Sequence, residues 1–482
     1  MKKDLTLKVA MFYETKKPSD IDPSRIHFSS EYLYLENIYS PLVEYNINGE
    51  LVAGVSKSFR WEGNDAVFEI REDLYTADGY KITAYDVEKS FKRLFILSTN
   101  THGNLKDMLC PNIELKSIGE SCPNMEVRDN GKIFVMRFKK KHPFLFPMLT
   151  AIDFAVIPSI SIDDKTLEIK DHRNTSGPYY VLSEDKLDLQ ANQKHYHYNE
   201  KMPQKIIYVY PKEQTVDSMI DLLKSNEIDH IPTGGVGTYP LIKFHRENRD
   251  INIHLTYPFK LFMLGFTNKG IKRFDSIKRF KIGLIMRQLF LPRYQPSQEF
   301  IPTYQIFPVI SEGNLASEQL NKLISKINSI KLPGIIKDKI SILNSPEIPE
   351  LKEVFPNIKY VYLKGIYGKI DFKKEKIDEP DLFFFITDMS FQEDINLLTY
   401  SINANIFKVR NNEAKLWLKD YMETDDKSER IKKLNKLHYE TLSEGYVFPI
   451  VFAPYAAILR KPWKFGLSKY YANNPIWRIY RE

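Results

Sequence analysis

The sequence predicts a mixed α/β protein with at least two lobes, and three observations lead to this class. The chain has 482 residues, whereas a single hydrophobic core stops growing at roughly 250–300 residues. Stretches with strand-like and helix-like periodicity alternate along the chain, which is typical of α/β architecture. Short strands joined by Asn-Gly and Asp-Gly turns indicate β-rich insertions.

The strand predictions rest on alternating apolar residues and on turn signals. Residues 5–13 alternate apolar and other side chains and predict a strand. Asn130-Gly131 joins Met125–Arg128 to Lys132–Phe138 and is the strongest hairpin signal in the chain. Further strands are predicted over 66–71, Tyr179–Leu182, Lys186–Gln190, Ile206–Tyr210, Lys339–Leu343, Tyr360–Leu363 and Asp381–Thr387.

Helices are predicted where apolar residues recur at helical spacing. One such stretch runs from Ser29 to Tyr39. Another helix starts at Thr83, because Thr83 and Asp86 have the spacing of a capping box. Two more helices are predicted over Thr215–Lys224 and Ser428–Leu442.

Composition and charge are those of an ordinary soluble globular protein. The chain is 43% hydrophobic and 27% charged. Its net charge of +7 comes from 69 basic and 62 acidic residues that are spread along the chain. A nucleic-acid-binding protein more often concentrates its positive charge in one stripe. We therefore expect no nucleic-acid partner.

The sequence shows neither an export signal nor a membrane span. Asp4 and Lys8 interrupt the N-terminal apolar residues, so a signal was removed or the protein stays inside the cell. The longest apolar run, Val447 to Leu459, contains Pro449 and Pro454 and is too short to span a bilayer of about 30 Å. We therefore expect a protein that is not transmembrane.

Cys110 and Cys122 are the two cysteines of the chain. A disulfide between them would close a short loop and would fit an oxidising compartment. Two free thiols are the alternative. A metal site is disfavoured, because one cysteine pair without nearby histidines is an incomplete ligand set.

No catalytic or cofactor-binding signature is present. The Gly-rich stretch Thr233–Gly237 lacks the strand–GxGxxG–helix context and is predicted to be a plain loop. His195 and His197 would share one face if they lay on a strand, but two histidines do not make a metal site. We expect a protein that is not an enzyme and that has no catalytic residues, no metal and no cofactor.

The stretch from Phe68 to Arg93 contains Asp78-Gly79 followed by Thr83-Ala84-Tyr85-Asp86-Val87. It resembles the strand–Asp-Gly–Thr-Ala-x-Asp-Val–helix signature of extracellular solute-binding protein family 5, the oligopeptide- and dipeptide-binding proteins of ABC importers. The remaining similar segments are Ile38–Glu50, Ser176–Tyr180, Glu227–Asp229 and Phe274–Arg279. The match covers most of residues 1–290 and then 380–482.

The resemblance implies a periplasmic-binding-protein-like, two-lobed clamp (type II) with an inserted β-rich third domain. Lobe I would hold residues 1–46, 173–262 and 452–482, the inserted domain 47–172, and lobe II 263–451. A ligand would lie between lobes I and II, and hinge closure around it would be an equilibrium that the ligand shifts.

The resemblance also implies a ligand anchor in lobe II. In the oligopeptide binders an Asp after a buried strand holds the ligand α-ammonium, and Thr387-Asp388-Met389 occupies that place. A carboxylate there would make a strong charge-assisted bond. Alternatively, Asp388 caps a turn or helix at the strand end. Glu393 and Asp394 could serve instead of Asp388.

Two other pairs are predicted to line the cleft from their position alone, Ser29-Ser30 and Gly265-Phe266. The second lobe departs from the family pattern, because residues 295–378 match poorly and one helix is shortened to Pro349–Phe355. Lys281 and Arg287 also stand where the family usually has Ala and Asp.

These features predict a substrate-binding protein that captures a peptide or peptide-like solute for ABC-type import. The predicted partners are that ligand and an ABC permease. The protein would be a monomer at the periplasmic or extracellular face of a bacterial membrane. As an alternative, the same clamp would serve as a ligand sensor or regulatory partner.

Overall fold

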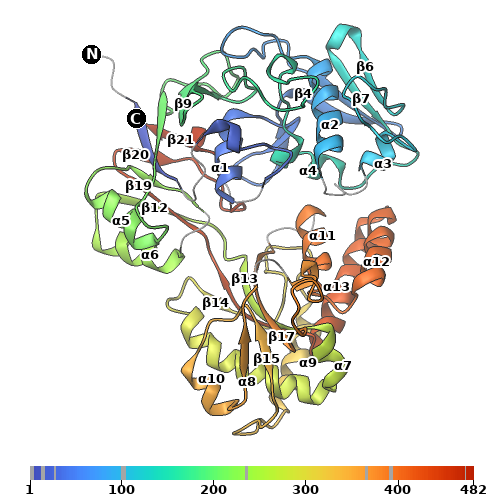
Figure 1. Ribbon diagram of the computed structural model, residues 1–482, viewed down its shortest axis with the longest axis vertical. Coiled ribbons are helices and arrows are strands. Elements are labelled where there is room, and N and C mark those ends of the chain that lie inside the picture. Colours follow the sequence, from blue (N-terminus) through green and yellow to red (C-terminus); the bar gives the residue numbers. More distant parts are fainter. Residues whose placement is uncertain are drawn as a thin grey trace. The chain divides into compact units, whose positions relative to one another are not determined.

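The computed structural model describes residues 5–11, 17–26, 29–98, 105–233, 237–363, 367–389, 395–472 and 474–482 (Figure 1). The chain divides into two compact units. Unit 1 holds Met1–Thr256 and Tyr455–Glu482, and unit 2 holds Tyr257–Pro454. The division into lobe I, an inserted domain and lobe II remains a prediction, and each unit is described by itself below.

The larger sheet of unit 1 is built around the N-terminal strand. In the described residues its strand order is β12-β19-β11-β1-β10-β9-β8. β1 pairs in parallel with β10 and β11, and the other neighbours are antiparallel. The bounds are β1 Thr6–Ala10, β8 Tyr179–Ser183, β9 Lys186–Ala191, β10 Lys205–Val209, β11 His230–Ile231, β12 Ile251–Leu255 and β19 Ala456–Arg460.

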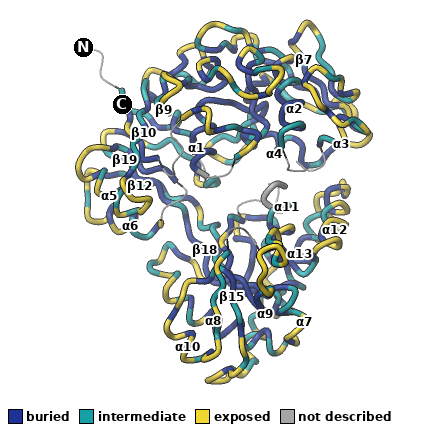
Figure 2. Tube along the Cα trace, in the orientation of Figure 1, coloured by how far each residue is buried: buried dark blue, intermediate teal, exposed yellow. Residues whose placement is uncertain are grey.

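Alternation along β1 explains how this sheet forms its core. Leu7 and Val9 are fully buried, whereas Lys8 between them is exposed. The strand ends at Ala10, earlier than the predicted residue 13, and residues 12–16 lie outside the described part of the chain. The helices of this part are α1 Ser29–Ile38, α5 Val216–Lys224 and α6 Thr238–Glu247. Figure 2 shows α1 and the strands near it as largely buried.

A second, antiparallel sheet in unit 1 has the order β4-β5-β7-β6 within the described residues. The predicted hairpin at Asn130-Gly131 is confirmed, and both residues have positive φ angles. α2 packs against β6 and β7. The bounds are β4 Ser56–Glu62, β5 Asp65–Ile70, β6 Met125–Arg128, β7 Ile133–Arg137, α2 Ala84–Leu97, α3 Leu105–Leu109 and α4 Leu145–Met148.

Local predictions in unit 1 have clear outcomes. The capping box of α2 is confirmed, since the Thr83 N–H donates to Asp86 Oδ2 at 2.8 Å. Cys110 and Cys122 form a disulfide.

Two small antiparallel strand pairs also belong to the described part of unit 1. They are β2 Val43–Tyr45 with β3 Leu51–Ala53, and β20 Trp463–Phe465 with β21 Ile479–Arg481.

Unit 2 is built on a mixed sheet, with the order β14-β18-β13-β17-β15-β16 in the described residues. β13 lies between β17 and β18 and is antiparallel to both, whereas β15 is parallel to β17 and β16. The strand bounds are β13 Lys260–Phe266, β14 Ile301–Pro302, β15 Ser341–Leu343, β16 Lys359–Val361, β17 Leu382–Asp388 and β18 Val447–Ala453.

The helices of unit 2 include α8, which packs against β13 and β18. The predicted short helix after residue 348 is present as α10. The helix bounds are α7 Asn268–Arg273, α8 Ser276–Tyr294, α9 Ser317–Asn328, α10 Pro349–Val354, α11 Ile395–Asn403, α12 Asn411–Glu423 and α13 Lys427–Ser443. Among the residues described, no helix is long and apolar enough to cross a membrane.

Candidate functional site

The predicted anchor Asp388 is the last residue of β17, a buried strand inside the sheet of unit 2. Its register partner on β13 is Lys260. Directly paired residues of an antiparallel ladder place their side chains on the same face. The structure therefore brings the Asp388 carboxylate next to a lysine that belongs to a distant part of the sequence.

The charges at this position influence one another. Burial lowers the pKa of Lys260, and the negative charge of Asp388 acts in the opposite direction. Burial also raises the pKa of Tyr400 on α11, and the charge of Asp388 raises it further. The negative charge at the end of β17 thus acts on both a nearby ammonium and a nearby phenol.

The same face of the sheet is accessible beside Asp388. Ile386, two residues before Asp388, has 45% of its surface exposed. Its register partner is Phe262, and the Lys260 ammonium lies 5.6 Å from the centre of the Phe262 ring. Lys260, Phe262, Ile386 and Asp388 therefore form one patch, which we call the strand-end patch. It combines apolar side chains with two opposite charges, which suits binding a ligand that has both kinds of group.

Thr387 and Met389 flank Asp388 in the sequence, but they pack on the face of the sheet opposite to Asp388. Thr387 alternates with Asp388 and is 7% exposed. The Met389 N–H donates to Phe259 O at 3.1 Å, and its sulfur accepts from the Ser401 hydroxyl at 3.6 Å. These contacts tie the end of β17 to the residue before β13 and to α11, so Met389 helps to hold Asp388 in place.

Gly265 and Phe266 lie at the opposite end of the β13–β17 ladder from Asp388. Gly265 lies five residue steps along the strand from Lys260, a distance of about 17 Å. A Cβ at Gly265 would lie 2.2 Å from the Phe383 ring, and Phe266 is fully buried. Their surroundings are those of core residues, and the structure does not bring them to Asp388.

Ser29 and Ser30 belong to unit 1, at the first turn of α1. Ser30 is 2% exposed, and its hydroxyl oxygen has no hydrogen-bond partner in the described part of the chain. The side chain of Ser29 lies outside what the structure describes, and so do Glu393 and Asp394. Their ligand roles remain predictions.

One of the two departures from the family pattern in α8, Arg287, has a structural role. Arg287 donates from Nε to Pro449 O at 2.7 Å and from Nη2 to Thr303 O at 2.9 Å. Its guanidinium also lies 4.0 Å from the centre of the Tyr304 ring. Arg287 therefore fastens α8 to β18 and to the segment after β14. Lys281, by contrast, makes no hydrogen bond or ion pair within the described residues that explains its place.

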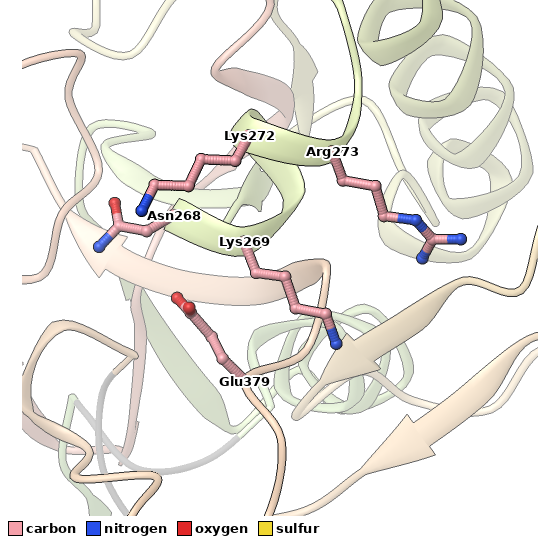
Figure 3. Close-up of a pocket in the computed structure, with 5 residues that line it drawn as sticks. All are labelled: Asn268, Lys269, Lys272, Arg273 and Glu379. Atoms are coloured by element: carbon pink, nitrogen blue, oxygen red, sulfur yellow. The ribbon is translucent and has the colours of Figure 1, made fainter.

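A hollow of about 420 Å³ in unit 2 lies beside α7. Figure 3 shows that its three cationic side chains, Lys269, Lys272 and Arg273, extend in different directions and do not converge on one point. Arg273 is already paired with Asp381 at 3.0 Å, and the Glu379 carboxylate accepts the Tyr367 hydroxyl at 2.6 Å. This arrangement does not resemble an anion site.

His195 and His197 lie in a turn and not on a strand. The strand on which their rings would share one face is therefore not formed. His195 is hydrogen-bonded to Ser176 O at 3.1 Å, and His197 to Glu44 at 2.7 Å. Within the described residues, no three His, Cys, Asp or Glu side chains are grouped to hold a metal ion.

Sequence reasoning did not identify Lys260, because its place beside Asp388 depends on strand register. The signal in the sequence was weak, since a lysine at the start of an apolar strand is usually solvated. The pairing register between strands that are distant in sequence is fixed only in the folded sheet, so a local sequence pattern cannot predict it.

The comparison with family models gives one match. Residues 50–281 match the model described as bacterial extracellular solute-binding proteins, family 5 Middle. A curated relative is the periplasmic murein peptide-binding protein MppA of Escherichia coli (strain K12), which is 32% identical over 81 residues. That alignment covers 16% of this chain and 15% of the length of MppA.

Solved structures extend the similarity to the whole chain. OppA of Haemophilus influenzae, solved in complex with RPPGFSPFR, has a TM-score of 0.70 at 15% identity and covers 99% of both chains. NikA of Staphylococcus aureus, solved in complex with Ni(L-His)2, has a TM-score of 0.68 at 15% identity and covers 99% of this chain and 100% of that chain. These comparisons confirm the predicted fold class and the resemblance to family 5.

Proposed function

We propose that this protein, whose residues 50–281 match family 5, captures a peptide or peptide-like solute between two lobes for ABC-type import. The match to that solute-binding family is the observation that carries the proposal. The peptide is supported by the ligands of similar proteins, a murein peptide for MppA and RPPGFSPFR for OppA. Ni(L-His)2 on NikA shows that this fold also takes other solutes.

The proposal assigns the ligand α-ammonium to Asp388. A carboxylate at the end of β17 beside an accessible apolar patch can accept a charge-assisted hydrogen bond, while Phe262 and Ile386 contact an apolar side chain. Backbone pairing with an extended peptide would supply affinity that is insensitive to side chains. The protein would be a monomer outside the cytoplasm, would present the ligand to an ABC permease, and would carry out no chemistry.

Isothermal titration calorimetry tests this anchor. A library of short synthetic peptides identifies a binder, and the same peptide is then measured with a free and an acetylated amino terminus. Asp388→Asn should weaken binding of the free-amine peptide roughly tenfold or more, because a hydrogen bond to a charged group contributes about 1.5–3 kcal/mol. The acetylated peptide should be affected less.

Asp378→Asn is the matched control, since Asp378 is an exposed carboxylate elsewhere in unit 2. It should leave both affinities unchanged. Equal affinity of wild type and Asp388→Asn for the free-amine peptide would remove Asp388 as the anchor. If the bound molecule instead regulates a partner protein and is not delivered to a permease, the sensor alternative holds.

A further inference from the structure

Unit 1 contains a hollow of about 400 Å³ that shares no residue with the strand-end patch. It lies against the β2–β3 hairpin, the segment after β9 and the C-terminal segment. Its volume falls within the range of about 300–1,000 Å³ for small-molecule sites. The lining that matters for ligand chemistry is Tyr45, Ile47, Val52, Lys201, Trp477 and Arg478.

The inner wall of this hollow is a fixed polar network. The Glu44 carboxylate accepts the Tyr196 hydroxyl at 2.6 Å and is bonded to His197 Nε2 at 2.7 Å. Burial alone would raise the pKa of Glu44, but His197 and Tyr196 outweigh it and the pKa is lowered. The His197 ring stacks on Trp477 with centroids 3.8 Å apart. Glu44 is thus ionised and already saturated by its own neighbours.

Arg478 is the cation of this hollow with remaining hydrogen-bonding capacity. One Nη2 donor bonds to Tyr45 O, and the guanidinium lies 4.9 Å from the centre of the Trp477 ring. Its other N–H groups have no hydrogen-bond partner among the residues that the structure describes. Burial lowers the pKa of Arg478, against the opposing charges of Glu44 and Glu36. An additional acceptor would therefore stabilise this guanidinium.

Lys201 adds a second positive charge at the hollow, with no carboxylate within 4.0 Å in the described part of the chain. The remaining walls are largely apolar, formed by Ile47, Val52 and the ring of Tyr45. A guanidinium fork matches the planar geometry of a carboxylate. The apolar walls exclude a ligand that is polar throughout and favour one with a hydrocarbon body.

We propose that this hollow is a second binding site, which takes a small monocarboxylate with an apolar body. The carboxylate pairs with Arg478 and is attracted by Lys201, and the hydrocarbon part lies against Ile47 and Val52. The site goes beyond the proposed peptide-binding function, because it lies wholly in unit 1 and does not involve Asp388.

Ligand-observed NMR on the full chain tests the proposal with phenylacetate and its neutral isostere phenylacetamide. Phenylacetate should bind saturably, and phenylacetamide should bind roughly tenfold more weakly or not at all, since loss of a charge-assisted bond is worth about 1.4 kcal/mol or more. Equal binding of the two probes, or no saturable binding of phenylacetate up to about 10 mM, would overturn the proposal.

Variants locate the site. Arg478→Met and Lys201→Met should each weaken phenylacetate binding, the first more than the second. Arg481→Met is the control, because the Arg481 side chain lies over Trp463 and outside the hollow. Arg478→Met also removes the bond to Tyr45, so Val52→Trp, which fills the hollow and leaves Arg478 intact, is measured beside it. Binding that survives Val52→Trp places the ligand elsewhere and contradicts the assignment.

Discussion

Asp388 and Lys260 are far apart in the sequence, and strand pairing places them side by side in the folded protein. Asp388 could be predicted because it follows a strongly apolar strand in a motif that resembles a known anchor. Lys260 could not, because its position opposite Asp388 depends on the β13–β17 register. The proposed α-ammonium site therefore already has one cation beside it.

The first prediction follows from that cation. Lys260→Met should strengthen binding of a free-amine peptide by roughly threefold to tenfold, because it removes a like charge close to the ligand ammonium. Calorimetry on the wild type and the variant measures the change, with exposed Lys359→Met of unit 2 as the control. Weaker binding by Lys260→Met would mean that Lys260 itself pairs with an anionic group of the ligand.

Glu36 on α1 gives a prediction about pH. Burial raises its pKa from 4.5 to about 7, while Arg478 opposes the shift and Glu44 adds to it. The folded protein therefore holds a proton on Glu36 that the unfolded chain has released between about pH 4.5 and 7. The stabilisation that protonated Glu36 gives the folded protein relative to the unfolded chain is present at low pH, and it is lost as the pH rises through about 7.

Glu36→Gln should remove this pH dependence. Relative to the wild type, the variant should gain on the order of 2 kcal/mol in free energy of unfolding between about pH 5 and pH 8. Urea denaturation at both pH values measures the difference, and exposed Glu114→Gln serves as the control. Identical pH slopes for the wild type and Glu36→Gln would contradict the assignment.

Among the secondary-structure elements, α2 shows which of its contacts a local sequence motif can predict. Thr83 and Asp86 were predicted to cap this helix, and the structure confirms it. Beyond the cap, Asp86 Oδ1 accepts from the Tyr80 hydroxyl and from the Ser159 N–H, both at 2.8 Å. The Ser159 contact comes from a segment 73 residues along the chain, so the capping pattern alone could not predict it.

The two cap residues should therefore differ in their effect on stability. Thr83→Ala should cost about 1 kcal/mol, as a lost cap usually does. Asp86→Ala should cost about 3 kcal/mol, because it also leaves the partly buried Ser159 N–H and Tyr80 hydroxyl without their acceptor. Urea denaturation compares the two variants. Equal losses would mean that the contacts of Asp86 beyond the cap contribute little.

Strands with clear alternation or a turn signal were well predicted, and those that depend on long-range pairing were not. The Asn130-Gly131 hairpin and β1 follow from local sequence. The prediction that Gly265 and Phe266 line the cleft rested only on their position along the chain. In the ladder they fall at the far end from Asp388, where they pack into the core.

At the scale of the whole molecule, the chain passes from unit 1 to unit 2 after Thr256 and returns after Pro454. The family match ends at residue 281, so most of unit 2 lies beyond it, including the strand-end residues Ile386 and Asp388. The fold could be predicted from motifs in the first half of the chain. The proposed anchor Asp388 lies in unit 2, where the sequence resembles the family less and where strand register cannot be predicted from the sequence.

Mass spectrometry of the ligands released from the purified, denatured protein tests the central claim most directly. We expect short peptides or peptide-like molecules with a free amino group to be recovered from the wild type and depleted from Asp388→Asn. Recovery of a non-peptide solute alone, in equal amounts from the wild type and Asp388→Asn, would contradict both the proposed ligand class and the proposed anchor.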